Sequence, residues 1–183
     1  MKETFNELIS YLKNPILEKD PNNKASYRFN KFLHLLIISI ITGALLTPLI
    51  VFVSELGLVN LDNHAMKDMM NKFGKPMILF LTVIAAPLLE ELFFRAPLTL
   101  FTGKKTFKIA FYLIAVLFGL VHITNYDMTI NVILLTPILV APQTILGGYL
   151  GFTRTRFGLQ WSILLHACYN AFFILISFAG ETI

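Results

Sequence analysis

Charged residues are scarce in this sequence, and their scarcity argues against an ordinary soluble protein. Only 14% of its 183 residues are charged, whereas 56% are hydrophobic and 17 are Phe. Soluble domains carry about a quarter charged residues, so the excess of apolar side chains predicts helices that face lipid. The length of the chain predicts one domain.

Several signatures of common protein classes are also missing. The single cysteine excludes an internal disulfide and any zinc site built from several cysteines. The sequence contains no HExxH, no GxSxG, no glycine-rich phosphate loop and no paired repeat of the transporter kind. The net charge is +4, but the basic residues lie between apolar segments and form no single patch, so we expect no nucleic-acid partner.

What the sequence does contain is a series of apolar stretches close to the roughly 20 residues that a membrane-spanning helix needs. They run over Phe32–Val53, about Pro76–Phe94 or as far as Phe101, Phe107 to about Ile123, Ile130–Phe152 and Leu159–Ala179. The expected fold class is therefore all-α, a polytopic membrane helix bundle with about five transmembrane helices in a domain over residues 32–183.

Residues 1–31 are predicted to form an N-terminal cytoplasmic or interfacial segment. An amphipathic helix is indicated by apolar residues at helical spacing before Pro15, namely Phe5, Leu8, Ile9 and Leu12. Of the 15 Lys and Arg residues, twelve fall on one side of the predicted membrane. These twelve include Arg154 and Arg156, in the turn after the fourth span. The positive-inside rule therefore predicts a cytoplasmic N-terminus.

The second apolar stretch contains Glu90, Glu91 and Arg95, and ionisable groups within a membrane span are usually functional. Glu91 and Arg95 are four residues apart, so they can pair on one helix face, either as a structural salt bridge or as support for a site. Glu90 lies about 100° around the helix and is left to face another neighbour. Pro87 and Pro97 predict a kink, because they remove helical hydrogen bonds to the carbonyls of residues 83 and 93.

Two further apolar stretches carry His122, at the end of the third, and the pair His166 and Asn170, four residues apart on one face of the fifth. Polar faces in an apolar chain are expected to be buried against one another, because lipid does not solvate them. The pattern predicts a single site that these residues share with Glu90. The alternative is an interhelical hydrogen-bond network without chemistry.

Other candidates are weaker by position. Cys168 is about 200° around the helix from His166, so it is not expected to act as a nucleophile beside that histidine. His34 and His64 fit no pattern and are expected to be incidental. The glycines of GGYLG, residues 147–151, predict a tight contact between helices.

The ordered set EELFFR (Glu90–Arg95), FGLVH (Phe118–His122) and HACYN (His166–Asn170) resembles the three motifs of the CPBP family. These are the CAAX protease and bacteriocin-processing membrane endopeptidases, also called the Abi family. The run GGYLGFTRTRFGLQWSILLH resembles the glycine-rich helix and basic turn before the third motif. The resemblance covers a protease-like core of about residues 75–180.

The resemblance implies an intramembrane peptidase, a hydrolase that acts on a peptide or protein substrate within the lipid bilayer. By resemblance Glu90 activates water with the help of His122, while His166 and Asn170 stabilise the oxyanion. The chemistry of the residues agrees, because a buried carboxylate is a stronger base and because an imidazole and an amide can both donate to an oxyanion.

Glu91 and Arg95 match the supporting pair of the family. The resemblance leaves the cofactor open: we expect either none or one divalent metal such as zinc, since a metalloprotease with Glu90, His122 and His166 as ligands is chemically reasonable. The alternative to an enzyme is a non-catalytic membrane adaptor or bacteriocin-immunity-type protein of the same fold.

Overall fold

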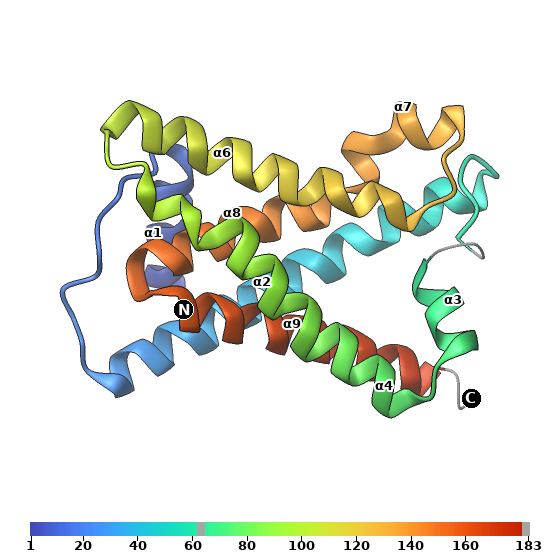
Figure 1. Cartoon of the computed structure of the whole chain (residues 1–183), viewed down its shortest axis with the longest axis horizontal. Coiled ribbons are helices and arrows are strands. Elements are labelled where there is room, and N and C mark those ends of the chain that lie inside the picture. Colours follow the sequence, from blue (N-terminus) through green and yellow to red (C-terminus); the bar gives the residue numbers. More distant parts are fainter. Residues whose placement is uncertain (62–64, 181–183) are drawn as a thin grey trace.

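The computed structural model describes residues 1–61 and 65–180, in which every regular element is a helix. Five helical segments of the described residues are long and apolar enough to cross a membrane: Ala25–Glu55, Lys75–Leu100, Lys104–Asn125, Ile130–Phe157 and Leu159–Gly180. They run side by side or cross at moderate angles (Figure 1), which confirms the expected all-α bundle. His64 lies outside the described residues.

The outer surface of the bundle is strongly apolar. Leu45, Phe93 and Leu134, on three different spans, are 73%, 75% and 71% exposed. Water would not solvate so many apolar side chains over whole helix faces, so the lipid of a bilayer covers them. The direction of insertion, with the N-terminus in the cytoplasm, stays a prediction.

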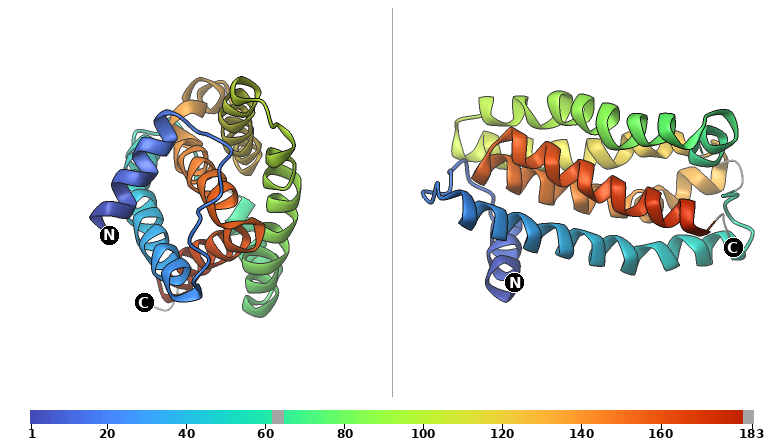
Figure 2. Two further views of the ribbon diagram at one scale, coloured as in Figure 1. Left: turned by 90° about the vertical axis from the view of Figure 1, so that its left-hand side faces the viewer. Right: turned by 90° about the horizontal axis from the view of Figure 1, so that it is seen from below.

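The N-terminal helix α1 (Lys2–Lys13) lies across the direction of the spans (Figure 2). Its buried residues are Thr4, Leu8 and Tyr11. The predicted apolar face is thus only partly correct, since Phe5 is exposed whereas Tyr11 packs inward. An ion pair of 2.7 Å between Glu7 and Lys31 ties α1 to the next helix.

That next helix, α2 (Ala25–Glu55), begins earlier than the apolar stretch that predicted it. Residues 25–31 are polar, so hydropathy alone does not include them, but the helix continues through them towards α1. His34 on α2 faces Thr4 of α1, with Nδ1 and Oγ1 3.0 Å apart, and so has a structural contact.

The second span is one helical run of changing width. It consists of α4 (Lys75–Leu79), η1 (Phe80–Ala85), α5 (Ala86–Glu90), η2 (Glu91–Arg95) and η3 (Pro97–Leu100), preceded by the short α3 (Ala65–Lys72). Both η1 and η2 are π-helical, with hydrogen bonds that reach back five residues instead of four.

Each π-helical segment ends two residues before a proline. The N–H of Ala86 donates to the carbonyl of Leu81, and the N–H of Ala96 to that of Glu91 at 2.9 Å. With hydrogen bonds that reach back five residues, Pro87 would donate to the carbonyl of Thr82 if it had an N–H. The proline therefore leaves the Thr82 carbonyl without a helical donor, and not that of Val83 as the α-helical spacing predicted. The disturbance expected from the prolines therefore takes the form of widened turns.

The remaining spans are α6 (Lys104–Val121) with the 3₁₀ turn η4 (His122–Asn125), then α7 (Ile130–Leu139), α8 (Ala141–Phe157) and α9 (Leu159–Gly180). The predicted span over Ile130–Phe152 is confirmed as a segment that extends to Phe157, but its helix is interrupted at Val140, between two prolines. Arg154 and Arg156 lie in the last turn of α8, and the turn itself is Gly158, whose φ of 109° suits glycine.

The helices α6 and α8 make the most extensive contact in the bundle, and glycines allow it. A Cβ on Gly147 would lie 3.1 Å from the carbonyl oxygen of Ala115, and one on Gly119 would lie 1.9 Å from Oγ1 of Thr144. The predicted role of the GGYLG run as a close helix contact is confirmed. This contact fixes α6, and hence His122 at its end, against α8.

Candidate active site

A cavity of about 370 Å³ brings together four of the residues singled out from the sequence: Glu90, His122, His166 and Asn170. They come from α5, η4 and α9, which are distant in the chain. The rest of its wall is largely apolar, with Ala86, Phe118, Leu146, Tyr169, Phe173 and Ile174 among the lining residues. Glu91 and Arg95 do not line the cavity and are fully buried behind it.

The two histidines converge on one oxygen of Glu90. Nε2 of His166 lies 3.8 Å and Nε2 of His122 lies 4.0 Å from Oε2 of Glu90. That oxygen is buried and has no hydrogen-bond partner among the described residues. These separations are wider than a direct hydrogen bond.

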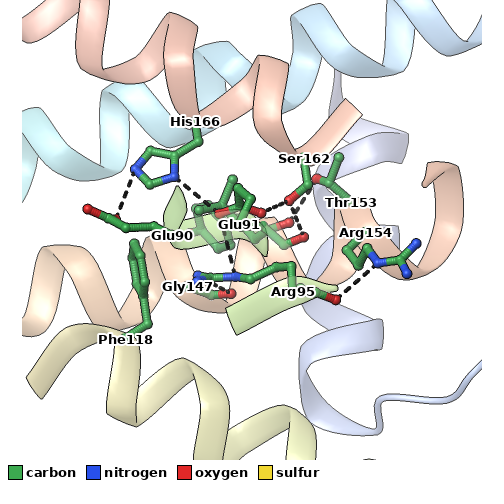
Figure 3. A network of polar contacts seen from close by, with 12 residues as sticks. Glu90, Glu91, Arg95, Phe118, Gly147, Thr153, Arg154, Ser162 and His166 are labelled. Atoms are coloured by element: carbon green, nitrogen blue, oxygen red, sulfur yellow. Dashed lines mark hydrogen bonds and ion pairs between the residues drawn. The ribbon is translucent and has the colours of Figure 1, made fainter. Parts of the chain in front are cut away.

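Each histidine is oriented through its other ring nitrogen. Nδ1 of His122 lies 2.7 Å from the carbonyl oxygen of Phe118, and Nδ1 of His166 lies 3.1 Å from Oε1 of Glu91. Both partners accept, so each Nδ1 carries the proton and each Nε2 faces Glu90. Figure 3 shows this arrangement for His166, whose ring lies between Glu90 and Glu91.

Glu91 is the centre of a buried polar cluster behind the cavity. Its carboxylate accepts from the hydroxyl of Ser162 and from His166, and its Oε1 lies 3.7 Å from Nε of Arg95. The pairing of Glu91 with Arg95 that the sequence predicted is therefore present. It is one part of a network that reaches His166 and hence the cavity.

Arg95 is held by contacts on several sides. Its Nη2 donates to the carbonyl of Gly147 at 3.4 Å, and its guanidinium carbon lies 3.8 Å from the ring centroid of Phe118. A cation over an aromatic face is attracted to it, more so away from water. The backbone carbonyl of Arg95 accepts in turn from Nε of Arg154 at 3.0 Å, so α8 caps the end of this helix.

Asn170 is tied to the π-helical part of the second span. Its Nδ2 donates to the carbonyl of Thr82 at 2.9 Å. This is the carbonyl that Pro87 leaves without a helical partner, so the amide satisfies a buried acceptor. One N–H of Asn170 is thereby used, and its second N–H is left for the cavity.

Sequence reasoning missed three residues of this arrangement. Ser162 is four residues before His166, so its place on the same helix face was a usable signal. Phe118 was seen only as a neighbour of His122, although its ring packs on His122, His166 and Arg95. Gln143 lines the cavity from α8, and an isolated amide in an apolar stretch gave no motif.

The fit of a metal ion can be judged from the same distances. Two imidazole nitrogens and a carboxylate oxygen are suitable zinc donors, but ligands bound at about 2.0–2.2 Å in a tetrahedron would lie roughly 3.4 Å apart. The separations from Glu90 are 3.8 and 4.0 Å. No group of three or more His, Cys, Asp or Glu side chains in the described chain has the arrangement of a metal site. As placed, these residues do not form a ligand set.

Comparison with known proteins gives one family. Residues 72–172, more than half of the chain, match the family described as Type II CAAX prenyl endopeptidase Rce1-like. No curated protein and no solved structure matches the chain. The matched range contains all six of the predicted site residues, and the five apolar spans make the molecule an integral, multi-pass membrane protein. The chain belongs to the Rce1-like family of type II CAAX prenyl endopeptidases, which confirms the family resemblance predicted from its motifs.

Proposed function

We propose that this protein is an intramembrane endopeptidase that hydrolyses peptide bonds with a water molecule activated by Glu90. The convergence of His122 and His166 on the unpartnered Oε2 of Glu90, inside the cavity that Asn170 also lines, carries the proposal. A carboxylate with no protein donor in an apolar cavity is free to take a proton from water.

In the first step, water gives one proton to Oε2 of Glu90 and directs its other hydrogen to Nε2 of His122. This ring is neutral, with its proton on Nδ1 towards the carbonyl of Phe118, so Nε2 accepts. The water oxygen bonds to the scissile carbonyl carbon, whose oxygen becomes an oxyanion. In the second step the C–N bond breaks as Glu90 passes its proton to the leaving nitrogen.

The oxyanion needs donors, and His166 and Asn170 supply them. Asn170 has its second N–H available. His166 donates from Nε2 only when its ring is protonated on both nitrogens, and Glu91 stabilises that cation through Nδ1 at 3.1 Å.

Glu91 faces both His166 and Arg95, with Oε1 3.1 Å from Nδ1 of His166 and 3.7 Å from Nε of Arg95. Glu91 therefore has two tasks in the proposed mechanism: it holds Arg95, and it keeps His166 as a donor.

The family name supplies the first substrate to test, a peptide with a prenylated CAAX end. In such an end the prenyl chain is attached to the cysteine. A bilayer would hold that chain while the peptide enters the cavity, and the apolar cavity wall suits the aliphatic residues that follow the cysteine.

The test is cleavage of internally quenched peptides by purified protein in lipid vesicles. One set ends in Cys-aliphatic-aliphatic-X with a farnesyl group on the cysteine, and a matched set lacks the farnesyl group. We expect wild type to cleave and Glu90→Gln to lose at least about a hundredfold in kcat, the contribution of a general base. Glu55→Gln, an exposed change at the end of α2, is the matched control and should cleave normally.

Two outcomes contradict the proposal in different ways. Cleavage by Glu90→Gln at the wild-type rate would remove the general base. Failure of wild type to cleave any peptide of either set, with an intact melting transition, would favour the non-catalytic adaptor of the same fold.

A further inference from the structure

Gln143 lies in the cavity, and the mechanism above gives it no task. Its Oε1 is buried and accepts no hydrogen bond from the described residues. An amide oxygen buried without a donor is unfavourable, so a native structure that keeps one calls for a physical reason. A ligand that brings its own N–H into the cavity would supply it.

The backbone around Gln143 holds its side chain in place. The residue follows Pro142 in the first turn of α8, directly after the interruption at Val140. Thr144, its neighbour, lies so close to Gly119 of α6 that a Cβ on this glycine would be 1.9 Å from the threonine Oγ1. His122 is three residues beyond Gly119, so the crossing of α6 and α8 carries Gln143 and His122 into the same cavity.

A bound peptide has requirements that the other groups do not meet. Glu90 and His122 receive the hydrogens of water, and His166 and Asn170 donate to the carbonyl oxygen. None of these groups accepts from the backbone N–H groups beside the scissile bond. A peptide N–H that leaves water without an acceptor weakens binding.

We infer that Gln143 accepts a hydrogen bond from a substrate backbone N–H within two residues of the scissile bond, and so holds the peptide extended across Glu90. This inference rests on the proposed function. It makes the substrate class an extended peptide with a free N–H at one fixed position, recognised through its backbone. A proline at that position lacks the N–H and would be cleaved poorly.

The experiment couples a change in the protein to a change in the substrate. Starting from the best-cleaved farnesylated peptide, single amides within two residues of the scissile bond, but not the scissile amide, are replaced one at a time by esters, which removes one N–H. With wild type, one ester position should lower kcat/KM by roughly ten- to a hundredfold, mostly through KM, as expected for loss of one buried hydrogen bond.

The variant Gln143→Met keeps the side-chain length and removes the acceptor. It should lower kcat/KM for the all-amide peptide by a similar factor, and the critical ester should then cost no more than about twofold. Ser177→Ala is the matched control, because Ser177 lines the same cavity about three helical turns beyond His166. In that variant the ester should cost as much as in wild type.

Three results would overturn the inference. The first is that Gln143→Met cleaves the all-amide peptide with the same kcat/KM as wild type. The second is that no ester replacement lowers kcat/KM with wild type. This result does not depend on whether a variant folds. The third is an ester loss in Gln143→Met as large as in wild type. Absence of any cleavage by wild type would instead overturn the proposed function, and this inference with it.

Discussion

Asn170 donates a hydrogen bond of 2.9 Å to the carbonyl of Thr82, the acceptor that Pro87 leaves without a partner in its own helix. A cavity residue of the fifth span thus completes the backbone of the second. The two spans are joined at the level of the cavity, and the orientation of the amide depends on the π-helical turn.

This relationship predicts coupling between residues 170 and 87. Asn170→Ala should lower the free energy of unfolding in detergent by about 1–3 kcal/mol, because it leaves the Thr82 carbonyl buried and unsatisfied. In a Pro87→Ala background, residue 87 has an N–H that can reach the Thr82 carbonyl. Asn170→Ala should then lower the free energy of unfolding by about half as much or less. Equal losses in both backgrounds, measured by unfolding curves, would contradict the coupling.

A second prediction concerns the hydroxyl behind the site. Ser162→Ala removes a donor to Glu91, and because Glu91 orients His166 it should lower kcat by about tenfold with little change in KM. Ser39→Ala is the matched buried control, since its hydroxyl donates only to the Leu35 carbonyl of its own helix. A loss confined to KM, or an equal loss in the control, would speak against the role of Ser162.

A third prediction separates the charge of Arg95 from its shape. Arg95→Ala should abolish activity and lower the free energy of unfolding by about 3–5 kcal/mol, because Glu91 is left as an uncompensated buried charge. Arg95→Lys should recover only part of the stability, since an ammonium does not lie flat on Phe118 or reach Gly147 in the same way.

The control for Arg95 removes both charges. Arg95→Met combined with Glu91→Gln should unfold at higher temperature than Arg95→Met alone, since no buried charge is then left unpaired. If the double variant is the less stable of the two, the pair is not the source of the loss.

A fourth prediction concerns metal. Protein purified to less than about 0.1 equivalents of zinc and other transition metals should retain full peptidase activity, and a chelator should leave kcat unchanged, since glutamate and water suffice in the proposed mechanism. Elemental analysis of the assayed sample gives the measurement. About one equivalent of metal, with reversible loss of activity on chelation, would contradict the metal-free mechanism.

A fifth prediction tests the helix crossing that positions His122. Gly119→Ala places a Cβ against Thr144, where even the Cα of that residue is only 3.1 Å away, so α6 and α8 must separate. We expect destabilisation by about 1–3 kcal/mol and a larger fractional loss of activity than of folded protein. Gly180→Ala, at the end of α9 with nothing within 4 Å of the added Cβ, is the control and should be neutral.

Hydropathy and motif spacing predicted much of this molecule, for identifiable reasons. An apolar stretch of sufficient length has few alternatives to a spanning helix, so the five spans follow from composition. Residues 25–31 of α2 were missed because they are polar and extend beyond the apolar part of the helix. The interruption at Val140 was missed because the hydropathy of residues 130–152 is continuous although the helix is not.

The site was predictable where two residues share a helix face and less so where helices meet. His166 with Asn170, and Glu91 with Arg95, follow from spacing along one helix. The stacking of Phe118 on Arg95 and the presence of Gln143 depend on how α8 crosses its neighbours, which one sequence does not specify. The π-helical turns likewise depend on packing that compensates the lost hydrogen bonds.

These widened turns have a consequence for how the length of the chain can vary. A π-helical turn accommodates one more residue than the α-helix it replaces, so deletion of a residue within Phe80–Ala85 would let the segment relax to an ordinary α-helix. The remaining residues would still complete the turn, so the part beyond it would keep nearly the same helical phase, and Glu90 would still face the cavity. A single-residue deletion in this segment should therefore be better tolerated than one in the middle of α9, where everything beyond the deletion would rotate by about 100°.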